Sequence, residues 1–356
     1  SRLNELAQKP GQPFLGLSAG YGKLIGDIDA YTLYGSAKEN QIIPTLQAMM
    51  REDYRVLRYG FLETELKRAK EEMLNNYERA AKEVDKTESA VFANEYVDNF
   101  LYKDPIPGAK RELNYANKYL ESITLEEVNA WAKKWITEEN MAVVVLAPEK
   151  EGVKVPTEAE LLAVIKDKSL ADVEPYVDTY KEQENKEKET LKPGAIVSEK
   201  DIPEISATEY ILSNGVRVVA KHTNFKNDQI LFSAQSKGGM SLYYDCDVPS
   251  LYFASDLVDR AGIAELDYSS LEKKLKGKRI SLSPNITAFT ESLGGSAAPK
   301  DLDLFFQYIN AFFTNPRKDT AVYQLVMDET KEQLKAMTSN PMYQFFGALL
   351  DALKQG

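Results

Sequence analysis

A long charged stretch divides the chain, and it sets the first limit on the fold. Residues 181–190 read Lys-Glu-Gln-Glu-Asn-Lys-Glu-Lys-Glu-Thr and offer nothing to a hydrophobic core. The region around them is predicted to form two polar helices, Thr157–Lys168 and Asp172–Glu189, before Lys192-Pro193-Gly194 ends the helical pattern. We therefore expect two folded units, residues 1–148 and 203–356, joined by a helical, highly charged linker over residues 149–202.

Residues 1–148 carry a mixture of strand and helix patterns. The predicted elements are strands at Phe14–Ile25 and Ile28–Tyr34 and helices at Gln41–Arg58, from Leu62 onward and at Thr87–Leu101. Thr124-Leu125-Glu126-Glu127 has the pattern of a capping box and predicts the start of a further helix. Met141–Leu146 is apolar throughout, which is typical of a strand inside a sheet.

Residues 203–356 show a similar content of elements. Glu209–Leu212 and Val216–Lys221 flank Ser213-Asn214-Gly215, a strong signal for a hairpin. The other predicted elements are strands at Ile230–Ser236, Arg279–Ser283 and Ile286–Leu293 and helices at Val248–Ala261, Ser269–Leu275, Asp301–Phe313, Thr320–Met337 and Met342–Leu353. The sequence predicts an α+β fold of two similar domains, each with helices packed on one face of a mostly antiparallel sheet.

The scarcity of histidine and cysteine excludes several kinds of site. Because His222 and Cys246 are single, this chain alone cannot build a disulfide, a thiolate cluster or a zinc site with two or three imidazoles. We expect Cys246 to be a small buried thiol and His222 to lie at the surface. Gly238-Gly239 and Gly294-Gly295 lack the spacing of a phosphate-binding loop and are predicted to end strands.

Charge and hydropathy limit the partners. With 44 Lys and Arg against 55 Asp and Glu, the net charge is −11, which argues against nucleic acid as a partner. No apolar run approaches the roughly 20 residues of a membrane span. The chain starts with Ser1 and lacks the pattern of a signal peptide, so we expect it to lie inside a longer gene product whose compartment these residues leave unknown.

Carboxylates offer one alternative for chemistry. Asp256 and Asp259 lie three residues apart on one predicted helix, and Asp328, Glu329 and Glu332 lie on a later one. If the two helices met, these oxygens could bind Mg²⁺ or Ca²⁺. The other interpretation is that they are solvated, as acidic residues on amphipathic helices usually are.

Residues 203–356 resemble a known family. Leu212-Ser213-Asn214-Gly215-Val216-Arg217-Val218, followed by a strand that ends at Lys237-Gly238-Gly239-Met240, is similar to the start of a domain in the insulinase/pitrilysin zinc metallopeptidases, a family that includes mitochondrial-processing-peptidase-like proteins. In that family the next helix carries His-x-x-Glu-His, and a later helix supplies a further Glu. Tyr252 and Asp256 stand at the two histidine positions, Ser255 at that of the glutamate base, and Glu329 about where the remote ligand would be. The resemblance therefore implies no catalytic or metal-binding residue here.

Residues 1–148 resemble the same family. Its matching stretches are Arg2–Pro10, Leu62–Lys70, and Ile123–Asn129 followed by Trp131-Ala132-Lys133-Lys134-Trp135. Long members have four similar, metallohydrolase-like domains, with the zinc motif in the first and an inactive copy in the third. The resemblance implies that residues 1–148 are an N-terminally truncated second domain, residues 149–202 the linker, and residues 203–356 a C-terminally truncated third domain.

The resemblance implies a function for the parent protein. We expect a zinc-dependent endopeptidase whose halves close like a clamshell over a peptide or an unfolded polypeptide. This chain would be its non-catalytic centre and would hold no cofactor, while the missing first domain would hold zinc. Its partners would be the missing first and fourth domains, and its compartment, by family likeness, the periplasm. The alternative is a catalytically inactive, family-related scaffold or assembly protein.

Overall fold

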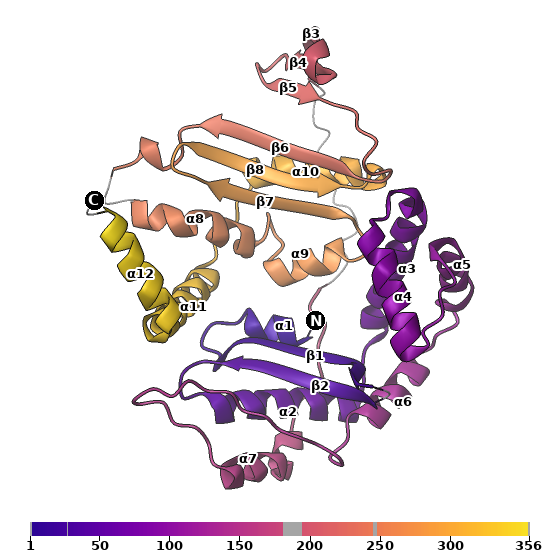
Figure 1. Ribbon diagram of the computed structural model, residues 1–356, viewed down its shortest axis with the longest axis vertical. Helices are drawn as coiled ribbons and strands as arrows, with labels where there is room; N and C mark the ends of the chain where they lie inside the picture. The colour runs from indigo at the N-terminus through magenta and orange to yellow at the C-terminus, as the bar shows by residue number, and fades with distance from the viewer. Residues whose placement is uncertain (1, 27, 181–193, 245–247, 355–356) are drawn as a thin grey trace.

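The computed structural model describes residues 2–26, 28–180, 194–244 and 248–354. In this part of the chain, helices combine with small antiparallel sheets, which confirms the predicted α+β class (Figure 1). No helix within it is both long enough and apolar enough to cross a membrane. We refer to residues 2–148 as the N-part, to residues 149–202 as the connector and to residues 203–354 as the C-part.

The N-part is built on a hairpin packed against a long helix. Its first elements are β1 (Phe14–Ile25), β2 (Ile28–Ala37) and α2 (Ile42–Tyr59). Both strands were predicted, and they pair antiparallel with each other. Phe14 and Leu17 of β1 form a buried cluster with Met49 of α2. Gly35 of β2 allows this close packing, because a Cβ there would lie only 2.8 Å from the sulfur of Met49.

The remaining helices of the N-part lie beside the hairpin (Figure 1). They are α1 (Arg2–Ala7), α3 (Glu63–Lys82), α4 (Ser89–Tyr102), α5 (Ala109–Tyr119) and α6 (Leu125–Trp135). The capping box predicted at Thr124 is confirmed, since its Oγ1 accepts from the Glu127 amide at 3.2 Å and its own amide donates to the Glu127 carboxylate at 2.8 Å. The ring of Trp135 stacks on Tyr21 of β1, with centroids 4.1 Å apart.

One strand predicted in the N-part does not form. Residues 141–146 adopt no regular secondary structure, and their side chains are largely exposed, 79% for Val144 and 93% for Leu146. A strand is held by its ladder of backbone hydrogen bonds to a neighbour. None of the described strands pairs with this segment, so its apolar composition alone does not make it a strand.

The first half of the connector packs onto the N-part. Helix α7 (Glu158–Ile165) falls within the predicted Thr157–Lys168 helix. Val164 of α7 and Leu170, which follows it, are buried in one cluster with Met50 and Tyr54 of α2. Helix α2 therefore has a buried side toward the hairpin and another toward the connector, so this stretch contributes to a core.

The second half of the connector differs from the predicted helices. Residues 172–180 adopt no regular secondary structure instead of the predicted helix, and residues 181–189 of that helix lie outside the described residues. Pro175 removes a backbone donor from that stretch, and Tyr176 and Asp178 are held by side chains from other elements. Near its end, β3 (Ile196–Ile202) is a strand that follows the predicted end of the helical pattern and still lies within the range assigned to the linker.

Two sheets follow. The first has the order β3-β4-β5, with β4 (Ala207–Leu212) and β5 (Arg217–Ala220), and lies apart at the top of Figure 1. Its predicted hairpin is confirmed, with Gly215 at φ 86° in the turn. The second has the order β6-β8-β7, with β6 (Ile230–Lys237), β7 (Ile280–Ile286) and β8 (Thr290–Ala297).

Helix α10 (Leu302–Thr314) packs on one face of the β6-β8-β7 sheet. Phe305 of α10 is 1% exposed and meets Phe232 of β6 edge to face, with ring centroids 5.4 Å apart. Gly294-Gly295 lies inside β8 rather than at its end, which corrects the prediction. The reason is close packing, because a Cβ on Gly295 would lie 2.3 Å from the Ser281 carbonyl and 3.1 Å from Phe305.

The last helices lie at the edges of the C-part (Figure 1). They are α8 (Val248–Ala261), α9 (Tyr268–Leu275), α11 (Thr320–Ser339) and α12 (Pro341–Lys354). Helices α8 and α11 contact each other, which brings the predicted motif positions on the two helices into the same region. His222 is exposed, as expected, and Cys246 lies outside the described residues.

Helix α3 belongs to the N-part by sequence but binds the C-part along much of its length. Asn75 donates to the Gly277 carbonyl at 2.6 Å and accepts from Lys300 at 2.6 Å. At its C-terminal end, Lys82 pairs with Asp228 at 3.1 Å. These polar contacts join segments that are more than 140 residues apart in the sequence.

Candidate functional site

Three of the positions that the resemblance assigns to the metal motif lie on one turn and a half of α8. Tyr252 is 67% exposed, Asp256 is also exposed, and Ser255 is partly buried. Tyr252 and Asp256 are four residues apart and therefore share a helix face, as two metal-binding histidines would. Glu329, the position of the remote ligand, lies on α11.

An arginine that the sequence analysis did not single out occupies the centre of this region. Arg260 of α8 donates two hydrogen bonds to the carboxylate of Glu329, at 2.6 and 3.1 Å, and each side chain is 18% exposed. Asp256 approaches the same guanidinium at 3.8 Å. The structure thus brings Asp256 and Glu329 together around a guanidinium. Among the described residues, neither Tyr252 nor Ser255 hydrogen-bonds to that group.

The electrostatics of the Arg260–Glu329 pair argue against a metal at these positions. The hydrogen bonds from Arg260 to Glu329 raise the pKa of the guanidinium above its already high value, against the effect of burial. The carboxylate at the ligand position is therefore neutralised by a permanent cation, and a divalent ion there would meet that cation. Tyr252, Ser255, Asp256 and Glu329 do not fit zinc.

The five carboxylates considered for Mg²⁺ or Ca²⁺ do not converge. Glu332 turns to Lys335 at 2.7 Å and to the Glu39 amide at 3.4 Å. Burial, with the nearby charge of Asp256, raises the pKa of Asp259. Within the described ranges, no group of three or more His, Cys, Asp or Glu side chains is placed to hold a metal ion.

A second polar site joins three distant segments of the chain. We define the Lys273 cluster as Glu5 of α1, Arg68 of α3, Tyr176 and Asp178 of the connector, and Lys273 of α9. The Lys273 ammonium lies 2.9 Å from Glu5, 3.0 Å from the Tyr176 hydroxyl and 3.1 Å from Asp178. Asp178 also accepts from Arg68 at 2.6 Å, and Tyr176 donates to Glu5 at 2.9 Å. Lys273 and Asp178 are only 7% and 6% exposed.

Hydrogen bonds in the Lys273 cluster outweigh the cost of burial. Burial alone would raise the pKa of Asp178, but the donors Arg68, Thr64 and Lys273 hold it at about 2. Burial alone would lower the pKa of Lys273, but Tyr176, Glu5 and Asp178 raise it. Burial raises the pKa of the Tyr176 hydroxyl to about 12. Asp178 and Lys273 therefore keep their charges at neutral pH, and the cluster fastens the connector between the N-part and the C-part.

The sequence held a signal for only one of these two sites. Asp256 and Arg260 show the spacing of a helical ion pair, which could have pointed to Arg260. The partners in the Lys273 cluster are up to 171 residues apart, as for Tyr176 and Glu5. No local pattern marks such a pairing.

Known proteins provide an independent comparison. No model of a known protein family matches the chain. The zinc protease PQQL-like protein of Arabidopsis thaliana is 28% identical over 212 residues, which are 59% of this chain and 22% of that protein. The probable zinc protease PqqL of Escherichia coli (strain K12) is 20% identical over 326 residues, which are 91% of this chain and 35% of that protein. Both relatives bear the name of the activity that the resemblance implied.

The chain is similar to zinc proteases of the PqqL-like kind, in line with the resemblance to the insulinase/pitrilysin family. It spans between about a fifth and two fifths of the length of the relatives it matches. The activity of those whole proteins is not thereby an activity of this chain.

One solved structure shows the same fold. The crystal structure of the ferredoxin protease FusC in complex with Arabidopsis ferredoxin matches 98% of this chain with a TM-score of 0.56 and 19% identity, and the match covers 39% of that chain. At that identity the likeness concerns the fold. The structure of the periplasmic protease PqqL from Escherichia coli is matched with a TM-score of 0.42 and 19% identity, over 99% of this chain and 39% of that one.

Proposed function

We propose that this chain is the non-catalytic central part of a zinc-dependent endopeptidase that degrades or processes peptides in a clamshell chamber. The observation that carries the proposal is the bidentate pair of Arg260 with Glu329 at 2.6 and 3.1 Å. The pair supports the proposal because a cation holds Glu329, the residue to which the resemblance assigns the position of the remote zinc ligand, in a chain related to zinc proteases. In this proposal, Tyr252, Ser255 and Asp256 are inactive remnants of the motif, and zinc belongs to another domain of the parent protein.

The proposed domain organisation follows the resemblance. Residues 1–148 would be the second domain of the first peptidase repeat, residues 149–202 the linker, and residues 203–356 the third domain, a copy of the zinc domain that has lost its ligands. The match to the Escherichia coli relative supports this, because it runs through 91% of the chain but only 35% of that protein.

An unpartnered apolar helix face also supports a larger parent protein. Helix α12 exposes large apolar side chains, with exposed fractions from 42% to 68%, at Met342, Tyr343, Phe345, Phe346, Leu349, Leu350 and Leu353. A contiguous apolar surface of this kind usually marks a contact with another protein surface. In the proposed parent, the missing first and fourth domains would supply such a surface.

Substrate and compartment are proposed from the relatives. The structural relative FusC was captured with ferredoxin, so its substrate is a protein. We propose peptides or unfolded polypeptides as the substrates of the parent of this chain. Since the Escherichia coli relative is named a periplasmic protease, we also propose the periplasm as its compartment. Fractionation of cells that produce the full-length parent would test this, and a parent confined to the cytosol would contradict it.

Metal content and proteolysis of residues 1–356 test the central claim. We expect far less than one zinc per chain after dialysis and no cleavage of a fluorogenic peptide library, with the full-length parent as positive control. Stoichiometric zinc together with peptide cleavage by this chain would overturn the proposal.

The parent gene decides between a protease and a scaffold. We expect the sequence upstream of Ser1 to encode His-x-x-Glu-His followed by a remote Glu. If the upstream motif is replaced as it is at Tyr252, Ser255 and Asp256, the parent is a catalytically inactive scaffold and the protease proposal fails.

A further inference from the structure

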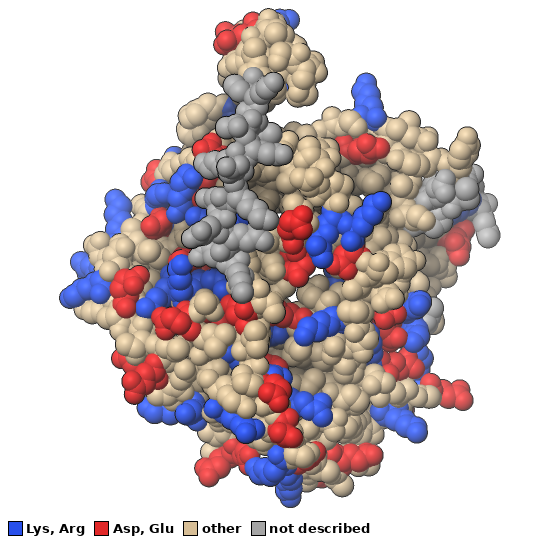
Figure 2. Space-filling view, turned by 180° about the vertical axis from the view of Figure 1, so that it is seen from behind, with Lys and Arg blue, Asp and Glu red and all other residues tan. Residues whose placement is uncertain are grey.

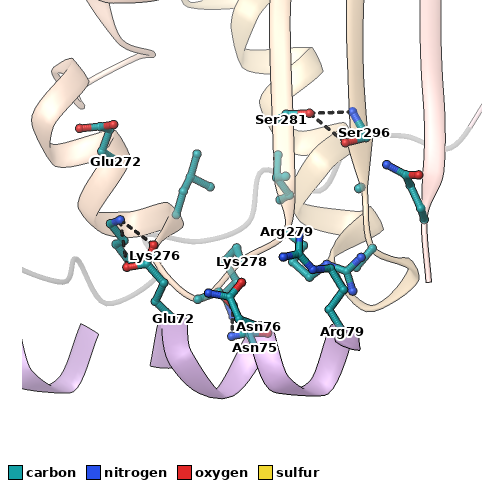
Figure 3. A pocket seen from close by; sticks show the side chains of 16 residues that line it. Glu72, Asn75, Asn76, Arg79, Glu272, Lys276, Lys278, Arg279, Ser281 and Ser296 are labelled. Carbon is teal, nitrogen blue, oxygen red and sulfur yellow. Dashed lines mark hydrogen bonds and ion pairs between the residues drawn. The ribbon is translucent and has the colours of Figure 1, made fainter. Parts of the chain in front are cut away.

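A cavity lies where α3 of the N-part faces the C-part. Its volume is about 470 Å³, which falls within the usual range for small-molecule sites of roughly 300–1,000 Å³. One wall comes from α3, and the other comes from the end of α9, the turn at residues 276–279 and the adjoining ends of β7 and β8 (Figure 3). Gly277, at φ 74°, lets this turn approach α3, since a Cβ there would lie 3.0 Å from the Cβ of Glu71.

Cations dominate the lining of this cavity. Four basic side chains line it against two carboxylates, those of Glu72 and Glu272, although the whole chain has a net charge of −11. On the face of the molecule in Figure 2, by contrast, basic and acidic side chains are interspersed. The excess of positive charge is thus a local property of the cavity.

Two of the four basic groups are already paired. Lys276 binds Glu72 at 2.9 Å, and Arg279 binds the carboxylate of Asp228 and donates to its carbonyl at 2.7 Å. The remaining two, Arg79 of α3 and Lys278 of the turn, are exposed, and within the described residues their side chains make no hydrogen bond or ion pair. They come from opposite walls (Figure 3).

The lining offers more free donors than free acceptors. The side chains of Arg79 and Lys278 can only donate hydrogen bonds. The side-chain amide of Asn76 has no hydrogen-bonding partner among the described residues. The hydroxyls of Ser281 and Ser296 are bonded to each other at 2.9 Å, and the Glu72 carboxylate is occupied by Lys276. A ligand that complements this lining brings oxygen acceptors and negative charge.

We propose that this cavity binds a compact oxyanion with at least two negative charges, held between Arg79 and Lys278. The shared chemistry is a pair of neighbouring anionic oxygen groups, which a polyphosphate or a polycarboxylate can provide. Because one cation comes from the N-part and the other from the C-part, the ligand bridges the two and stabilises their arrangement. This site is distinct from the motif positions on α8 and α11 and does not depend on the proposed protease function.

Calorimetric titration of pyrophosphate into the chain at constant ionic strength tests the proposal. We expect saturable binding at one site and a rise in the melting temperature with ligand concentration. The double variant R79Q/K278Q should weaken binding at least roughly tenfold, because each lost charged hydrogen bond is worth that much or more. Both residues are exposed, so this variant should fold.

The matched control is K110Q/R111Q on α5. It removes the same two charges from exposed positions outside the cavity and should bind pyrophosphate as the unmodified chain does. A parallel titration with citrate assigns the source, since tighter binding of pyrophosphate points to a phosphate compound and tighter binding of citrate to a carboxylate compound. Absence of saturable binding of both probes, or an equal loss in the two double variants, would overturn the proposal.

Discussion

The Arg260–Glu329 pair and the Lys273 cluster use the same chemistry in different settings. In each, a basic side chain meets carboxylates with little exposure to solvent. The first joins two helices of the C-part, is 18% exposed at both partners and includes Glu329, a position that the resemblance assigns to a metal motif. The second joins α1, α3, the connector and α9 and is almost fully buried at Lys273 and Asp178. An ion pair can therefore lie where a metal site would be expected, or it can join separate parts of the chain. We expect the more deeply buried of the two to contribute more to the free energy of unfolding.

The largest effect is expected at Lys273. The variant K273M leaves Asp178 and Glu5 without their ammonium partner, and breaking a buried pair from one side costs about 3 kcal/mol or more. Urea unfolding should show this loss, whereas K274M, one residue along on the exposed side of α9, should unfold almost as the unmodified chain does. Equal stability of K273M and K274M would show that the cluster does not fasten the parts.

Acid should weaken the Lys273 cluster through Asp178. Its pKa is about 2 in the folded protein, below its ordinary value of 3.8, so its contribution is present above about pH 4 and is lost as the pH falls through 2. The difference in unfolding free energy between the unmodified chain and D178N should therefore be about 2 kcal/mol larger at pH 5 than at pH 2. A difference that stays constant with pH would contradict this assignment.

Asp53 provides a comparison with the opposite sign. It is buried in α2 and accepts from Tyr31 at 2.7 Å, and burial raises its pKa to about 6 despite that hydrogen bond. Its contribution therefore favours the folded state below about pH 4 and is lost as the pH rises through 6. Because Asp53 is present in both the unmodified chain and D178N, its contribution cancels in the difference between their unfolding free energies at each pH.

A smaller effect is expected for the Arg260–Glu329 pair. In a double-mutant cycle with R260M, E329M and the double variant, we expect a coupling free energy of about 1–2 kcal/mol, since the pair is only partly buried. The double variant should be more stable than either single variant. Each single variant leaves one charge without its partner, whereas the double variant removes both charges. A coupling near zero would remove the argument that the pair replaces a metal.

The smallest effect is expected at Asp256. Its carboxylate lies 3.8 Å from Arg260 and is half exposed. Exposed ion pairs contribute about 0–1 kcal/mol, so D256N should change the unfolding free energy by less than about 0.5 kcal/mol. A loss as large as that of E329M would show that Asp256 and Glu329 hold Arg260 equally.

The sequence predicted best those elements whose residues carry their own local signal. The β1–β2 hairpin, the capping box at Thr124 and the Asn214-Gly215 turn were all readable, because alternation, a side-chain cap and a positive φ are set within a few residues. Helix α5 was not predicted, although it lies between two predicted helices.

Where the sequence misled, distant residues decided the outcome. Residues 141–146 have a strand composition but no described strand beside them. Residues 172–180 were expected to be helical, yet they form no helix, and Tyr176 and Asp178 bind Glu5 and Arg68 instead. The candidate site shows the same pattern, since the motif positions were identified but Arg260 gains its meaning only from Glu329, 69 residues later.

Through the contacts of α3, the N-part and the C-part are held together by non-covalent interactions as well as by the chain that connects them. By sequence, α3 precedes the connector, yet Asn75, Lys82 and their neighbours bind residues 227–300 directly. A protease that cut the chain once between Tyr180 and Gly194 would therefore yield two peptides that remain associated in solution and separate only under denaturing conditions. The peptide chain is one of several connections between the two parts, so the two fragments of a cut chain would behave like the subunits of a non-covalent complex.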